Sequence, residues 1–81
     1  MIATVYTGRS CIWCERVKEL LRENNYTIEE IPIDKDKIEE FKTKYNKEIK
    51  TVPQVIIENN LVGGYHEVEA LMKGPTSINK V

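Results

Sequence analysis

The sequence predicts one α/β domain in which helices cover both faces of a four-stranded mixed sheet. Its 81 residues suffice for a single small domain, with residues 74–81 as a short C-terminal tail. Short β-branched runs alternate with segments of helical periodicity in the order β-α-β-α-β-β-α. The first helical connection makes its two strands parallel, and a tight turn makes the last two strands an antiparallel hairpin.

The first strand is expected at Ile2–Tyr6, a nearly continuous apolar run typical of a strand buried on both faces. Ser10 is the expected N-cap of the helix that follows the break at Gly8. This helix places apolar residues at helical spacing on one side, and its charged residues are expected to face solvent. The apolar side holds Trp13, Val17, Leu20 and Leu21; the solvent side holds Glu15, Arg16, Lys18, Glu19 and Arg22.

The second strand is expected at Tyr26–Ile33, with Pro32 confining its end to an edge or exit of the sheet. Asp36 and Glu39 have the spacing of a capping box, which predicts a second helix beginning there. That helix is expected to bury three residues of its apolar side: Ile38, Phe41 and Tyr45.

The third strand is expected at Gln54–Ile57, followed by a tight turn at Asn59-Asn60 and a return through Leu61-Val62. A third helix is expected from Glu67 to Lys73, stopped by Gly74-Pro75. Its inward residues should be Val68, Leu71 and Met72.

Composition excludes several classes of function. The net charge of −1 argues against a nucleic-acid binder, which would usually be clearly basic. No apolar run approaches the roughly 18 residues of a membrane span, and no leader pattern precedes the first strand. We therefore expect a cytoplasmic, monomeric protein without nucleic-acid or membrane partners.

The strongest chemical signal is Cys11-Ile12-Trp13-Cys14, which holds the only two cysteines of the chain. At the start of a helix this spacing puts both sulfurs on one face, near enough to bond, as a redox dithiol requires. Free N–H groups and the neighbouring Arg9 favour a thiolate on Cys11, the expected nucleophile. Cys14, deeper in the helix, suits the resolving role.

Two other interpretations of the cysteine pair stay open. A structural disulfide would close too short a loop to restrict the unfolded chain strongly. Half of a zinc site would need further ligands, and only His66 remains among the usual nitrogen and sulfur donors. We expect no metal.

Three motifs around the cysteines resemble the small dithiol glutaredoxins of the thioredoxin superfamily. They are Tyr6-Thr7, Thr51-Val52-Pro53-Gln54 and Gly63-Gly64-Tyr65. The resemblance runs from Ile2 to about Met72. It implies a thioredoxin-like fold and an enzyme that reduces protein disulfides and glutathione mixed disulfides with electrons from glutathione. By family analogy, ribonucleotide reductase is a candidate protein substrate.

The resemblance also implies a groove for glutathione. The backbone of Val52, before a cis Pro53, would pair with the cysteinyl part of the ligand. Free N–H groups at His66 and Glu67 would take the γ-glutamyl carboxylate, and the Glu67 side chain would face the ligand's amino group. The implied glutathione-binding residues are Arg9, Trp13, Thr51, Val52, Pro53, Gly64, His66 and Glu67.

Other residues have a less definite relation to this groove. Trp13 would form one of its walls, although a core position in line with Val17 fits its spacing nearly as well. Lys47 or Lys50 would hold the glycyl carboxylate of glutathione.

The sequence departs from the usual glutaredoxin pattern at several positions. Ile12 and Trp13 stand where Pro and Tyr are common, and Gly8 stands where a basic residue is usual, with Arg9 one place later. Glu67 replaces an Asp, and His66 stands where a small hydroxyl or Asp is usual. These changes bear on glutathione affinity more than on the fold.

Two other functions are compatible with the same fold. A redoxin fed by thioredoxin reductase, acting as hydrogen donor to ribonucleotide reductase, usually carries Trp-Ser-Gly-Phe where this chain has Leu61-Val62-Gly63-Gly64-Tyr65. An iron–sulfur carrier would share a cluster between two chains through Cys11 and two glutathiones.

Overall fold

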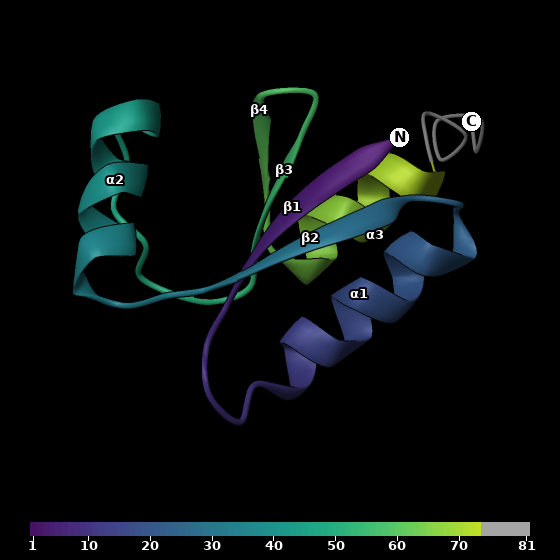
Figure 1. The fold of residues 1–81 in the computed structure, drawn as a ribbon. Coiled ribbons are helices and arrows are strands. Elements are labelled where there is room, and N and C mark those ends of the chain that lie inside the picture. The colour runs from purple at the N-terminus through teal and green to yellow at the C-terminus, as the bar shows by residue number, and fades with distance from the viewer. Residues whose placement is uncertain (74–81) are drawn as a thin grey trace.

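The computed structural model describes residues 1–73, and these form four strands and three helices in the expected order (Figure 1). The elements are β1 (Ile2–Thr7), α1 (Ile12–Glu23), β2 (Thr27–Pro32), α2 (Lys35–Tyr45), β3 (Gln54–Ile57), β4 (Asn60–Gly63) and α3 (Tyr65–Lys73). The expected tail and the helix stop at Gly74-Pro75 lie outside the described residues. None of the three helices is both long enough and apolar enough to cross a bilayer.

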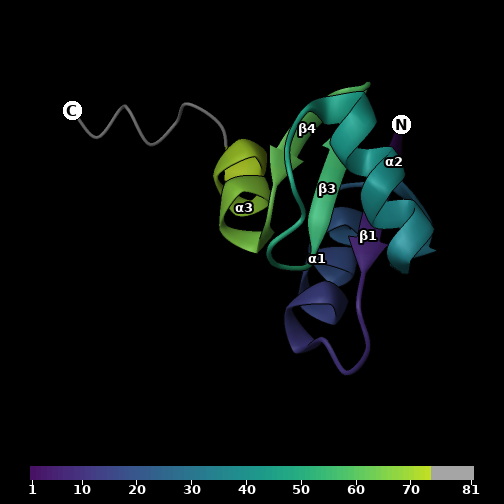
Figure 2. The same cartoon turned by 90° about the vertical axis from the view of Figure 1, so that its left-hand side faces the viewer.

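The sheet has the strand order β2-β1-β3-β4. β1 is parallel to β2, with Tyr6 opposite Ile31, and antiparallel to β3, with Val5 opposite Val55. β4 returns antiparallel to β3. Helices α1 and α3 cover one face of the sheet and α2 covers the other (Figures 1 and 2). This arrangement is the thioredoxin-like fold that the resemblance implied.

Each face of the sheet has its own hydrophobic core, and β1 contributes to both. Ala3 and Val5 are fully buried under α1 and α3, whereas Tyr6 packs edge-on against Phe41 of α2, with ring centroids 5.1 Å apart. The larger core also includes Val17, Leu21, Val55, Ile57 and Val68. The expectation that the first strand is buried on both faces is therefore confirmed, except that Ile2 at its start is exposed.

Both predicted N-caps were wrong. Ser10 has a positive φ of 49°, and Cys11 caps α1 instead, with extended backbone and its sulfur accepting from the Cys14 N–H. Asp34, rather than Asp36, caps α2 by accepting from the Lys37 N–H at 2.8 Å. A cap needs extended backbone. Asp34 has it because the chain is still extended as it leaves β2.

The third strand was predicted correctly, but the hairpin turn and the third helix differ in detail. The positive φ values fall on Glu58 and Asn59, and Asn60 already belongs to β4. Helix α3 begins at Tyr65, two residues early, and Leu71 is exposed while Val68 is buried.

The clearest error concerns Lys18. It was expected on the solvent side of the first helix, but it is buried between α1 and β2. In the sequence, Lys18 was placed on the solvent side of the helix only because lysine is charged. Its carboxylate partner Glu30 comes from another element, which the periodicity of the helix does not include.

Candidate functional site

The loop between β1 and α1 brings the first cysteine against the loop before β3. Gly8 makes this close approach possible, because a Cβ at this position would lie 3.0 Å from Cγ2 of Val52. The left-handed Ser10 then turns the chain into α1. Glutaredoxins usually have a basic side chain at the position of Gly8. Gly8 has none, and the loop before α1 therefore packs directly against the loop before β3.

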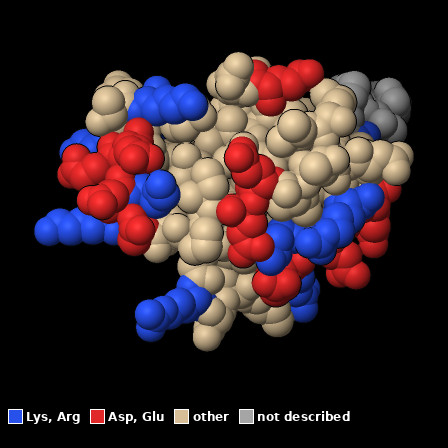
Figure 3. Space-filling model, in the orientation of Figure 1, with Lys and Arg blue, Asp and Glu red and all other residues tan. Residues whose placement is uncertain are grey.

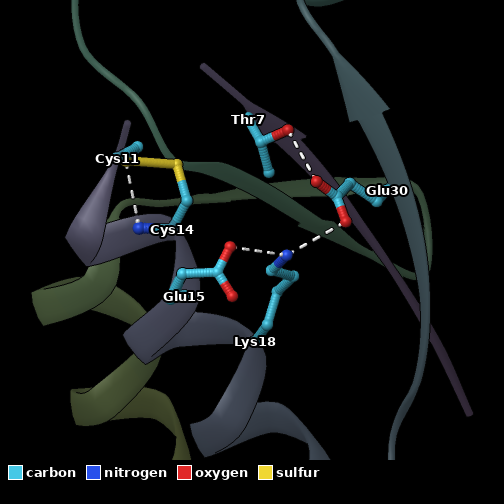
Figure 4. Close-up of polar contacts among 6 residues, drawn as sticks. All are labelled: Thr7, Cys11, Cys14, Glu15, Lys18 and Glu30. Atoms are coloured by element: carbon cyan, nitrogen blue, oxygen red, sulfur yellow. Dashed lines mark hydrogen bonds and ion pairs between the residues drawn. A yellow bond between two sulfur atoms is a disulfide. The ribbon is translucent and has the colours of Figure 1, made fainter. Parts of the chain in front are cut away.

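Cys11 and Cys14 form a disulfide at the start of α1, with their Cα atoms 5.2 Å apart (Figure 4). The Cys14 N–H donates to the Cys11 Sγ at 3.0 Å, and the same sulfur lies 3.7 Å from the Val52 carbonyl oxygen. A helix N-terminus and a donated N–H both stabilise negative charge on a sulfur. Cys11 is partly exposed and Cys14 is buried. Cys11, the predicted nucleophile, is therefore the more accessible of the two residues, and Cys14 is the predicted resolving thiol.

A groove of about 260 Å³ is lined by residues from α1, the loop before β3 and the start of α3. Its lining consists of Trp13, Thr51, Val52, Pro53, Gly64, Tyr65, His66 and Glu67. Seven of the eight residues that the resemblance implied for glutathione are therefore brought together. The eighth, Arg9, is exposed and does not line the groove. The Val52–Pro53 peptide bond is cis, as expected.

Trp13 forms a wall of the groove rather than part of the core. The residue is 42% exposed, and the centroid of its ring lies 5.2 Å from that of Tyr65 and 5.5 Å from that of His66. The guanidinium of Arg16 sits 5.0 Å over the Trp13 ring. Tyr65 was not among the predicted site residues, although it ends the Gly63-Gly64-Tyr65 motif that indicated the site.

Glu67 folds back onto the start of its own helix. The Gly64 N–H donates to Oε1 of Glu67 at 2.9 Å. Gly63 has a φ of +123°, and a Cβ there would lie 3.0 Å from Cγ of Glu67. The glycines thus let the chain pass close to this carboxylate. Glu67 therefore holds negative charge at the positive end of α3.

The two lysines considered for the glycyl carboxylate line a second hollow next to the groove. Lys47 and Lys50 share it with Glu48, Thr51 and Gln54, so Thr51 borders both hollows. Both lysines are exposed, and the geometry does not distinguish them. Within residues 1–73, no group of three or more His, Cys, Asp or Glu side chains is arranged to hold a metal.

An ion-pair network that the sequence did not reveal lies next to the cysteines (Figure 4). The Nζ of Lys18 is 3.0 Å from Oε2 of Glu15 and 3.0 Å from Oε1 of Glu30, and the Thr7 hydroxyl donates to Oε2 of Glu30 at 3.0 Å. Hydrogen bonds to Glu15 and then Glu30 raise the pKa of Lys18. Hydrogen bonds from Lys18 and then Thr7 lower the pKa of Glu30.

With this geometry in place, comparison with known proteins decides the family. The Glutaredoxin family model matches residues 3–62, which span β1 through most of β4 and include both cysteines. The chain belongs to the glutaredoxin family. Membership together with the Cys11–Cys14 pair supports a thiol–disulfide oxidoreductase.

Individual relatives agree with this assignment. The chain is 46% identical over 63 residues to glutaredoxin 1 of Rickettsia conorii, covering 74% of this chain but only 61% of that protein. It is 31% identical over 67 residues to glutaredoxin 3 of Escherichia coli K12, covering 83% of this chain and 81% of that one.

Solved structures show the same fold. Glutaredoxin 1 from Francisella tularensis, complexed with cacodylate, has a TM-score of 0.72 and 28% identity, with 94% of this chain and 96% of that chain covered. A buckwheat glutaredoxin–glutathione complex has a TM-score of 0.73 at 21% identity, with 95% and 73% covered.

Proposed function

We propose that this glutaredoxin reduces glutathione mixed disulfides and protein disulfides with electrons from glutathione. The observation that carries the proposal is the position of the Cys11 sulfur. It accepts a hydrogen bond from the Cys14 N–H and lies beside the carbonyl of Val52, which lines the groove. The glutathione bound to the buckwheat glutaredoxin, a protein of the same fold, is consistent with a groove of this kind.

The first step is attack of the Cys11 thiolate on the glutathione sulfur of a mixed disulfide. A Cys11–glutathione disulfide forms, the substrate's S–S bond breaks, and the substrate leaves as a thiolate that takes a proton from water. A second glutathione thiolate then attacks this disulfide, releases glutathione disulfide and restores Cys11. The redox balance closes because one glutathione thiol is oxidised and joins the glutathione of the mixed disulfide as glutathione disulfide, while the substrate sulfur is reduced to a thiol.

Protein disulfides require the second thiol. Cys11 attacks the substrate disulfide, and Cys14 resolves the mixed disulfide by forming the Cys11–Cys14 bond described above. Two glutathione molecules then reduce that bond. Cys14 suits this role because it is buried behind Cys11 and lies within bonding reach of it.

Within the groove, the backbone of Val52 would pair with the cysteinyl part of glutathione as an added strand. The first N–H groups of α3, at His66 and Glu67, would receive the γ-glutamyl carboxylate. Lys47 or Lys50 would meet the glycyl carboxylate at the other end. Trp13 would cover the ligand from the side of α1.

We also propose a cytoplasmic location and a monomeric state. A lone cysteine pair in a reducing compartment is more often catalytic than structural, which favours the cytoplasm for a dithiol enzyme. Disulfide-containing proteins would be its partners, and ribonucleotide reductase is a candidate by family analogy alone.

Two coupled assays test the proposed electron donor. One contains a small glutathione mixed disulfide with glutathione, glutathione reductase and NADPH; the other replaces the glutathione system with thioredoxin reductase. We expect turnover only in the first, lost in Cys11→Ser and reduced less in Cys14→Ser. Turnover only in the second would overturn the proposal in favour of a thioredoxin-reductase-linked redoxin. No turnover in either assay, together with a brown colour after anaerobic reconstitution with iron and sulfide, would overturn the proposal in favour of an iron–sulfur carrier.

A further inference from the structure

The buried Lys18 occupies the same side of α1 as the resolving cysteine. It follows Cys14 by four residues, a spacing that stacks side chains on one helix face, and helical side chains lean toward the N-terminus. Figure 4 shows the Lys18 side chain extending from the helix toward the end that carries the two cysteines. Both Lys18 and Cys14 are buried. A buried cation therefore lies on the same side of α1 as the sulfur that must become a thiolate during resolution.

The network around Lys18 supplies charge and does not exchange protons near neutral pH. The pKa of Lys18 is raised above that of a free lysine, first by its hydrogen bond to Glu15. The pKa of Glu30 is lowered, first by its hydrogen bond from Lys18. An ammonium that holds its proton more firmly and a carboxylate that holds its proton less firmly are both fixed ions. Neither can accept the Cys14 proton.

Screening decides which sign of charge acts on the buried sulfur. The Lys18 side chain is 8% exposed, whereas those of Glu15 and Glu30 are 71% and 42% exposed. Water weakens the field of exposed charges far more than that of buried ones. Of the three charges, that of the Lys18 ammonium is therefore weakened least by water.

Other charged groups also surround the site, among them the carboxylate of Glu67, which accepts from the Gly64 N–H at the start of α3 and borders the groove. Arg22 on α1 acts on Glu30 with the same sign as Lys18. The strand β1 contributes the neutral hydroxyl of Thr7. The residues of α3 that pack in the core on this side are Tyr65, Val68 and Met72.

We propose that Lys18 is a positioning residue for the resolving step, its buried charge stabilising Cys14 as a thiolate. In that step the Cys14 thiolate attacks Cys11 Sγ of the mixed disulfide, the Cys11–Cys14 bond forms, and the bond from Cys11 to the substrate sulfur breaks. The departing thiolate takes a proton from water. Burial alone disfavours a thiolate, and a nearby cation offsets that cost.

A direct titration of Cys14 tests this inference without any electron donor, so its outcome is independent of the proposed glutathione dependence. The Cys11→Ser chain is labelled with ¹³C at the cysteine Cβ, and the titration of Cys14 is followed by NMR. The same titration is carried out on the double variant that also carries Lys18→Met. We expect Lys18→Met to raise the titration midpoint by roughly one pH unit, a tenfold loss of thiolate at neutral pH. Lys18→Arg keeps the charge and should keep the midpoint.

Two further variants separate charge from a merely structural clamp. Lys42→Met removes an exposed, ion-paired lysine of α2 on the other face of the sheet and should leave the midpoint unchanged. Glu30→Gln removes a partly opposing charge and should lower the midpoint, the reverse of Lys18→Met. Circular dichroism checks the fold of each variant. If Lys18→Met does not fold, the shift of the Cys14 titration midpoint in Glu30→Gln tests the inference instead. A midpoint unmoved by Lys18→Met, or raised by Glu30→Gln, would overturn the inference.

Activity provides a second readout. Lys18→Met should slow reduction of a protein disulfide, which requires Cys14, roughly tenfold at neutral pH if resolution limits the rate. The same substitution in the Cys14→Ser background should leave turnover of a glutathione mixed disulfide unchanged, because that route uses Cys11 alone. An equal loss in both backgrounds would assign Lys18 a role in the fold or at Cys11 instead.

Discussion

Replacement of Gly8 is expected to destabilise the protein because Gly8 lies directly against Val52. In Gly8→Ala, the new Cβ would stand 3.0 Å from Cγ2 of Val52, whereas ordinary van der Waals contacts begin at 3.4 Å. Forcing an extra methyl into such a contact typically destabilises a protein by about 1–3 kcal/mol. For a domain of this size, each kcal/mol lowers the melting temperature by roughly 4–8 °C. Relief of this contact requires the Val52 side chain to move.

The assay combines thermal and urea unfolding, followed by circular dichroism, with a double-mutant cycle. Val52→Ala removes the opposing methyl groups and alone should cost about 1 kcal/mol. If the contact is the cause, Gly8→Ala with Val52→Ala should be less destabilised than the sum of the single variants by about 1 kcal/mol or more. Strict additivity, or a Gly8→Ala protein as stable as the parent, would refute the reasoning.

Three other predictions follow from the same structure. The ion pair of Lys18 with Glu30 links stability to pH, because folding lowers the pKa of Glu30 below its unfolded-state value of 4.5. The ion pair therefore stabilises the folded protein fully above pH 4.5, and this stabilisation is lost as the pH falls through the lower folded-state pKa. Acid unfolding of the parent and of Glu30→Gln should therefore converge at low pH, and a constant difference between them would contradict the link. Trp13→Ala should raise KM for a glutathione mixed disulfide about three- to tenfold, as loss of an aromatic contact would, while Trp13→Tyr should retain most affinity. An unchanged KM in steady-state assays would remove Trp13 from the binding surface. Phe41→Ala should cost about 3–5 kcal/mol in urea unfolding, because the ring is fully buried, yet leave turnover per folded molecule unchanged, since α2 lies across the sheet from α1 and the cysteines. A turnover loss in the folded variant would show that the two faces are coupled.

The sequence predicted the order of elements because each strand and helix carries its own periodicity. Phe41 and Val68, for example, fall at helical spacing and are buried as expected. The groove beside Cys11 could be assembled from motifs far apart in the chain only through the resemblance to glutaredoxins, since no periodicity brings Val52 next to Glu67.

The errors arose where a tertiary partner decides the outcome. Lys18 was assigned to solvent because its carboxylate partner Glu30 lies on another element. Ser10 satisfied the residue preference of a cap, but the turn onto Val52 leaves it with left-handed backbone and passes the capping role to Cys11. Gly8 could be recognised as a departure from the family pattern, but its reason appears only when the two loops are packed together.

The most direct test of the account is to trap the intermediate on Cys11. The Cys14→Ser chain is incubated with glutathione disulfide and analysed by intact-protein mass spectrometry, beside the Cys11→Ser chain treated in the same way. The account predicts one glutathione on Cys14→Ser, released by added glutathione, and little or none on Cys11→Ser, whose remaining thiol is buried. Preferential modification of Cys11→Ser, or no adduct on Cys14→Ser, would contradict the assignment of Cys11 as the nucleophile that carries glutathione.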